Sequence, residues 1–123
     1  MALGKIKADT LEHSTAGSLD TKFVVNGSAK AWCNADNSHA IQDSFNIASV
    51  ADGGTGNYTM TVINAMSNSD FSYSGIAGNT TNDDGFWAGG SKSTTTYFVR
   101  CRTYNGNLND AAEASTVIHG DLA

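Results

Sequence analysis

Three histidines and two cysteines are the residues of this chain best suited to nucleophilic or metal chemistry. A catalytic triad needs a serine or cysteine, a histidine and a carboxylate within reach of one another. His39 has acidic neighbours, Asp36 and Asp43, whereas His13 and His119 lie near the two ends. The chain has no Gly-x-Ser-x-Gly turn, the signature of a strained nucleophile elbow. Because His39 lies in a polar segment, we expect it to be a solvated loop residue.

The cysteines and the acidic turns do not have the spacing of a reactive or metal-binding site. Cys33 and Cys101 are 68 positions apart, which is not the close spacing of a zinc site. We expect two buried free thiols, with a disulfide as the alternative if their strands are neighbours. Asp52-Gly53-Gly54 and Asn82-Asp83-Asp84 lack the ligand spacing of an EF-hand, and turn chemistry accounts for both. The prediction is no catalytic residue, no metal and no cofactor.

The composition indicates a folded chain with a small core. Asn, Ser, Thr and Gly make up 51 of the 123 residues, and Leu, Ile, Val and Phe only 22. The length fits one domain. The net charge of −5 and the lack of a basic run argue against nucleic acid and against a polybasic membrane patch. We also expect no transmembrane helix and no secretory signal.

The first 20 residues predict an extended N-terminal arm. Apolar and charged residues alternate over residues 5–10, and a small polar connector follows at residues 14–18. The arm has too little apolar surface to fold alone, so we expect it to be ordered against another chain. Leu3, Ile6 and Leu11 are its candidate assembly residues.

Residues 21–123 predict an antiparallel β-sandwich, jelly-roll-like, in an all-β fold. Residues 22–25 are expected to form a strand that turns at Asn26-Gly27, the preferred pair for a type I′ hairpin. Residues 41–50 alternate as one long strand, residues 94–104 form another, and a single helical turn is expected at residues 110–113. The candidate core or inter-subunit residues on these strands are Trp32, Phe45, Ile47, Tyr58 and Phe98, with Phe45 and Ile47 both pointing inward.

A long Gly/Asn/Asp loop is expected over residues 77–93, with Phe86 and Trp87 at its middle. Aromatic side chains on an exposed loop can stack on sugars or anchor a protein interface. The alternative is that both rings fold back and cap the core. Phe86 and Trp87 are therefore candidate surface-contact residues.

Several segments together resemble a β-domain that recurs in bacteriophage tail-fibre and related virion proteins, especially those of marine phages. The most specific segment runs from Asp43 to Val62 and includes Asp52-Gly53-Gly54-Thr55-Gly56-Asn57-Tyr58. Ala29-Lys30-Ala31-Trp32, the opening residues 4–11 and the closing residues 115–121 are similar to the same family. The resemblance covers most of residues 4–121.

The resemblance implies a structural or adhesive role with no catalytic residues. The expected function is that of a non-enzymatic virion protein, a tail-fibre-like appendage that self-associates, usually as a homotrimer. Its expected partners are other virion proteins and a host-surface glycan or protein, and its expected location is the virion, assembled in the host cytoplasm. The alternative is a capsid decoration or head-fibre protein that binds the shell. A small glycan hydrolase is disfavoured, because it would need paired carboxylates in a cleft.

Overall fold

The computed structural model describes residues 4, 7–78 and 86–123, with residues 86–88 described by their backbone alone. Within these ranges the chain forms one short helix and ten strands. The N-terminal elements are β1 (Thr10–His13), β2 (Gly17–Asp20) and α1 (Thr21–Gly27). The remaining strands are β3 (Ala31–Ala35), β4 (Ile41–Phe45), β5 (Ile47–Asp52), β6 (Asn57–Val62), β7 (Ser72–Gly78), β8 (Phe86–Lys92), β9 (Thr96–Arg102) and β10 (Glu113–His119).

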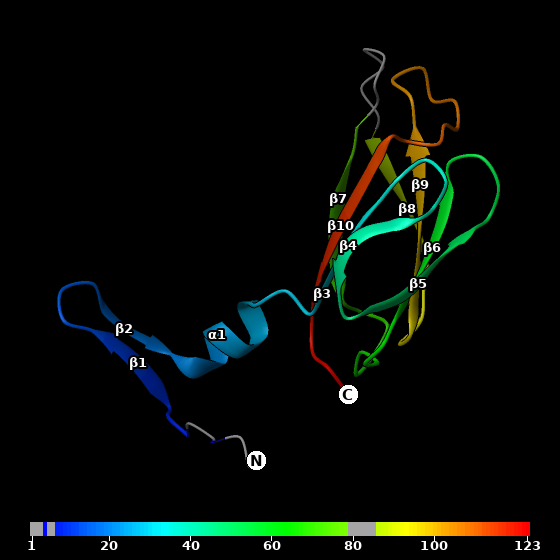
Figure 1. Ribbon diagram of the computed structural model, residues 1–123. Helices are drawn as coiled ribbons and strands as arrows, with labels where there is room; N and C mark the ends of the chain where they lie inside the picture. The colour runs from blue at the N-terminus through cyan, green and yellow to red at the C-terminus, as the bar shows by residue number, and fades with distance from the viewer. Residues whose placement is uncertain (1–3, 5–6, 79–85) are drawn as a thin grey trace.

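Strands β3 to β10 form two four-stranded sheets that face each other (Figure 1). The first sheet has the order β4-β3-β10-β7 and the second the order β5-β6-β9-β8. The strand pairs within both sheets are antiparallel. The predicted all-β antiparallel sandwich is therefore confirmed.

The core lies between the sheets and follows from the period-two alternation of the strands. Along β6, the buried side chains are Tyr58, Met60 and Val62, and on β9 they are Tyr97, Val99 and Cys101. Two of these positions, Tyr58 and Cys101, are a predicted core aromatic and a predicted buried thiol. Cys33 on β3 is also buried, and both thiols are free, as expected.

The predicted single strand over residues 41–50 is wrong, because the chain turns from one sheet to the other at Asn46. Asn46 has a φ of 57°, a left-handed conformation that interrupts the strand. Its buried side chain donates to the Lys30 carbonyl oxygen (2.9 Å) and accepts from the Asn64 backbone N–H (2.8 Å). Opposite sets of alternate side chains therefore face the core before and after the turn. Ile47 is therefore buried as expected, whereas Phe45 is 54% exposed and not a core residue.

The predicted strand over residues 22–25 is also wrong, because these residues form α1. Phe23, Val24 and Val25 have high strand propensity, but a strand needs a neighbour to complete its hydrogen bonds. No strand of the sheets described above pairs with this segment, and the helix satisfies its backbone locally. The amide of Ser28, for example, donates to the Val24 carbonyl oxygen at 3.1 Å. The Asn26-Gly27 pair ends the helix and forms no hairpin turn.

One predicted loop and one predicted helical turn differ from the structure. The expected loop over residues 77–93 includes the end of β7 and all of β8, and Phe86 and Trp87 begin β8, in register with Arg102 and Cys101 on β9. A glycine-rich segment has low strand propensity, and pairing with β9 overrides it. The expected helical turn at residues 110–113 is absent, since Glu113 begins β10.

Candidate functional site

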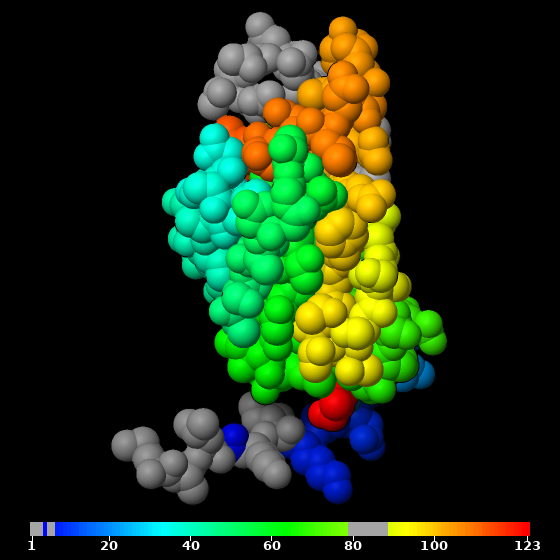
Figure 2. Space-filling model, turned by 90° about the vertical axis from the view of Figure 1, so that its right-hand side faces the viewer, coloured from blue at the N-terminus to red at the C-terminus, as the bar shows by residue number. Residues whose placement is uncertain are grey.

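The arm and α1 project beyond one end of the sandwich, next to the C-terminus (Figures 1 and 2). Strands β1 and β2 form a hairpin whose turn is held by His13, because its Nδ1 accepts from the amide of Ala16 at 3.1 Å. Thr21 joins the hairpin to the helix, since its amide donates to the Asp9 carbonyl oxygen at 2.8 Å. The arm is thus a defined hairpin–helix unit, more structured than the extended arm that the sequence predicts.

The large apolar side chains of this hairpin–helix unit are exposed to solvent. Phe23 is 58% exposed and Val25 63%, and α1 has no buried residue. An apolar side chain on a small domain normally gains about 1.5–3 kcal/mol by full burial. The other exposed apolar residues of the unit are Leu11, Leu19 and Val24. Leu11, a candidate assembly residue, is thus exposed, whereas Leu3 and Ile6 lie outside the described residues.

Two grooves flank α1, and Val24 and Val25 line both of them. The smaller groove, about 300 Å³, lies between the helix and the hairpin and is also lined by Lys7, Ala8, Leu11 and Thr21. The larger groove, about 450 Å³, lies between the helix and the end of the sandwich. We call the larger groove the slot, and its remaining lining residues are Ser28, Ala29, Lys30, Phe45, Asn46, Asn64 and Leu122.

The walls of the slot are held in place by local hydrogen bonds. The Nζ of Lys30 donates to the Ser28 carbonyl oxygen at 2.9 Å and to the Val25 carbonyl oxygen. These bonds connect the end of α1 to the chain that enters β3. On the opposite wall, Asn46 and Asn64 are joined by a side-chain hydrogen bond of 2.9 Å. The slot is therefore a shaped apolar recess whose polar groups already have partners.

The predicted core or inter-subunit residues divide into two groups. Tyr58 and Ile47 belong to the core. Trp32 (37% exposed) and Phe45 pair across β3 and β4, and both point out of the sandwich. Phe98 lies half-buried on the outer face of the second sheet, with the Arg100 guanidinium 5.3 Å from its ring centre. The core assignment is thus wrong for Trp32, Phe45 and Phe98, because each occupies the outward parity of its strand.

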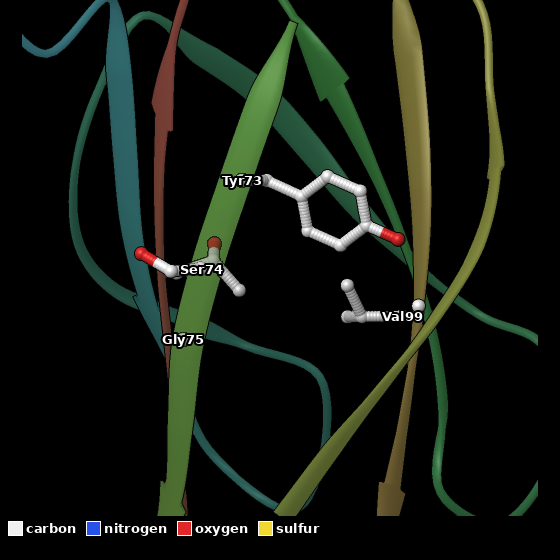
Figure 3. A pocket seen from close by; sticks show the side chains of 6 residues that line it. Tyr73, Ser74, Gly75 and Val99 are labelled. Carbon is white, nitrogen blue, oxygen red and sulfur yellow. The ribbon is translucent and has the colours of Figure 1, made fainter.

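A cavity of about 400 Å³ lies between the edge strands β7 and β8 (Figure 3). The Tyr73 ring projects across it toward Val99, and its hydroxyl accepts from the amide of Gly90 at 2.9 Å. The cavity exists because Gly75 and Gly89 contribute no side chain to its wall. Ser74 and Thr116 complete the lining, so the described lining holds no ionisable group other than the Tyr73 phenol.

His39 is buried, so its prediction as a solvated residue is wrong. Its ring stacks on Tyr58 with 4.1 Å between ring centres, and its Nε2 lies 3.6 Å from Oδ1 of Asp52. The residue is only 8% exposed, and its backbone has a φ of 64°. Sequence reasoning missed this because burial of the ring depends on β6, far along the chain. His39 packs as an aromatic ring and has no serine or cysteine among its contacts above.

Two carboxylates near His39, Asp36 in the sequence and Asp52 in space, are used by turns. Asp36 accepts from the hydroxyl of Ser38 (2.6 Å), from the backbone amides of Ser38 and Ala40, and from the side-chain amide of Gln42. These hydrogen bonds, led by the Ser38 hydroxyl, lower the pKa of Asp36 below its usual value. Asp52 likewise accepts from the Gly54 amide at 2.7 Å. The two carboxylates therefore hold loops in place and do not face a cleft.

Among the described residues, no three His, Cys, Asp or Glu side chains gather closely enough to hold a metal ion. The described part of the chain also holds no helix that is long and apolar enough to span a membrane. The fold and the exposed hairpin–helix unit define a β-sandwich with a projecting N-terminal arm. No protein-family model matches the chain, and neither a curated protein nor a solved structure matches it.

Proposed function

We propose that this protein is a non-enzymatic structural component of a bacteriophage virion, a tail-fibre-like appendage that acts by self-association and attachment. The observation that carries the proposal is the hairpin–helix unit, in which Leu11, Leu19, Phe23, Val24 and Val25 are all exposed. A segment of this kind gains stability only when another surface covers it. The unit is therefore an assembly element, and the sandwich is the body that it attaches.

The sequence resemblance supports the virion assignment. Its most specific segment, Asp43 to Val62, spans β4 to β6 and includes the turn at Asn46 between the sheets. Its other segments include the start of β3 and most of β10, which pair with each other in the first sheet. The motif thus corresponds to the framework of the sandwich. Such a framework suits a β-sandwich displayed on the virion, whose loops contact a host surface or a neighbouring virion protein.

The chemistry of the described residues agrees with a non-enzymatic role. The buried imidazole of His39 stacks on Tyr58, and Asp36 and Asp52 are committed to turns. A hydrolase of glycans needs two carboxylates facing each other across a substrate cleft. The cavity beside Tyr73 is lined by hydroxyl, glycine and valine groups. We therefore expect the purified protein to bind without turning over a substrate.

Labelling of virions tests the location. Gold-conjugated antibodies raised against the purified chain are applied to particles of a phage whose genome encodes it, and the particles are imaged by electron microscopy. Label on the tail or its fibres supports the proposal. Label confined to the capsid shell overturns the appendage assignment and makes the protein a capsid decoration. Particles without label overturn the virion assignment altogether, provided that an antibody to the major capsid protein labels the same particles.

A further inference from the structure

The helix α1 carries three consecutive exposed apolar residues, which no single neighbouring surface can cover. Successive residues of an α-helix are about 100° apart around its axis. Phe23 is therefore about 100° from Val24 and about 160° from Val25. Val24 and Val25 line the slot, and Phe23 lines neither groove. The Phe23 ring is consequently directed away from the slot of its own chain.

We propose that Phe23 of one copy inserts into the slot of a second copy of this chain, in a closed head-to-tail ring. This inference rests on the proposed self-association and names its contact. The inserted ring meets Val24, Phe45 and Leu122, all of them exposed apolar residues of the slot. Buried aromatic anchors in preformed pockets are the usual energetic centres of protein interfaces. Because the Phe23 side chain and the slot are different surfaces, the contact repeats from copy to copy, and it closes as a ring when the rotation between successive copies completes a full turn.

The distribution of charge favours a second copy as the occupant. Residues 1–29 carry three lysines and three acidic residues, so the arm is electrically neutral. Residues 30–123 carry four basic and nine acidic residues, so the whole net charge of −5 lies on the sandwich. Like charges repel, so sandwiches resist packing on one another, whereas neutral arms can converge. A ring in which the neutral arm of each copy meets the slot of the next copy keeps the acidic bodies apart.

The exposed area also fits a self-association contact. Phe23, Val25, Phe45 and Leu122 are 58%, 63%, 54% and 43% exposed, and Leu11, Leu19 and Val24 are 42–48% exposed. Aromatic side chains present roughly 150–250 Å² each and aliphatic ones about 100–150 Å², so these seven residues leave on the order of 500 Å² per copy. A stable interface buries about 800 Å² per partner. The arm and the slot together supply most of that area.

Two complementary variants test the head-to-tail contact. Phe23→Asp removes the inserting ring and leaves the slot intact. Leu122→Asp places a charge in the slot and leaves the Phe23 ring intact. Both side chains are exposed, so neither substitution disturbs the core, and circular dichroism with thermal unfolding checks the fold. Ile76→Asp is the matched control, because Ile76 is 70% exposed on β7 and lines neither groove beside α1.

Light scattering on the full chain is expected to show an oligomer for the wild type and for Ile76→Asp. Each of the other two variants should be monomeric, with self-association weakened at least ~30-fold, the loss typical of a central anchor. Mixing the two monomeric variants should restore a 1:1 complex and nothing larger. Leu122→Asp still has the Phe23 ring, and Phe23→Asp still has an intact slot, so each pair can form one contact. This recovery is specific to a head-to-tail contact.

Three results would overturn the inference. An oligomer that persists in Phe23→Asp shows that the ring is not the anchor. If the two monomeric variants form no complex on mixing, the same surface of each copy meets in the wild-type oligomer. That result excludes the head-to-tail arrangement. A monomeric wild type overturns both the inference and the self-association in the proposed function, while virion labelling still decides the location separately.

Discussion

The hydroxyl of Tyr97 on β9 lies 2.8 Å from Oγ1 of Thr116 on β10, and both residues are buried. Because β9 and β10 belong to different sheets, this hydrogen bond crosses the core. A buried hydroxyl without a partner is costly, so each residue satisfies the other. The pair therefore favours one alignment of the two sheets over others that are equally apolar.

Replacement of Tyr97 by phenylalanine is expected to lower the free energy of unfolding by about 1–2 kcal/mol, because it leaves the Thr116 hydroxyl buried and unpaired. Urea denaturation measures the change. The double variant Tyr97→Phe/Thr116→Val should be less destabilised than the sum of the single variants, since it removes both partners. Strict additivity in this cycle would contradict the bond across the sheets.

The fold is expected to lose stability in alkali. Burial raises the pKa of Tyr58 and of Tyr97 to about 12. An unfolded phenol ionises near pH 10, so the unfolded state releases these protons first. The stability contributed by the neutral phenols is complete below about pH 10 and is lost as the pH rises toward 12.

Urea midpoints between pH 8 and pH 12, combined with phenolate absorbance, measure this loss. Tyr97→Phe serves as the comparison, because removal of this buried phenol should remove its share of the loss above pH 10. Ionisation of Tyr58 and Tyr97 near pH 10, in a protein that stays folded, would contradict the prediction.

Two substitutions at Asn46 separate its hydrogen bonds from its backbone conformation. Asn46→Ala loses the bonds to Lys30 and Asn64 and also forces alanine into a φ of 57°, so a loss of about 2–4 kcal/mol is expected. Asn46→Gly loses the same bonds without the backbone strain. The glycine variant should therefore be about 1–2 kcal/mol more stable than the alanine variant in urea denaturation. Equal stability of the two variants would show that the left-handed turn carries no cost.

The two thiols are expected to be inert in the native protein. Burial raises the pKa of Cys33 to about 11, and burial likewise raises that of Cys101 above its usual value. The thiolate is the reactive form, so a disulfide-exchange reagent at pH 8 should label neither cysteine until urea unfolds the chain. Two labelled thiols should then appear. Rapid labelling of the folded protein would contradict the burial of both side chains.

Alternation along single strands was enough to predict the sandwich and part of its core. Tyr58 follows from the period-two pattern that holds from end to end of β6, whereas on β9 the predicted core residue Phe98 lies on the outward face and the opposite parity, with Val99 and Cys101, is buried. The same reasoning failed for Phe45, because one left-handed residue, Asn46, reverses the inward parity. Nothing local distinguishes Asn46 from the other asparagines of the chain. Its role depends on contacts with Lys30 and Asn64, which are distant in sequence.

The sequence by itself predicted the class of fold and the burial of the two thiols. Strand periodicity and composition are local properties, and local properties predict such features. Only the tertiary structure decided that residues 21–27 are helical, that His39 is buried against Tyr58, and that a slot lies beside α1. Each of these depends on whether a distant segment is present to pair with or to pack against.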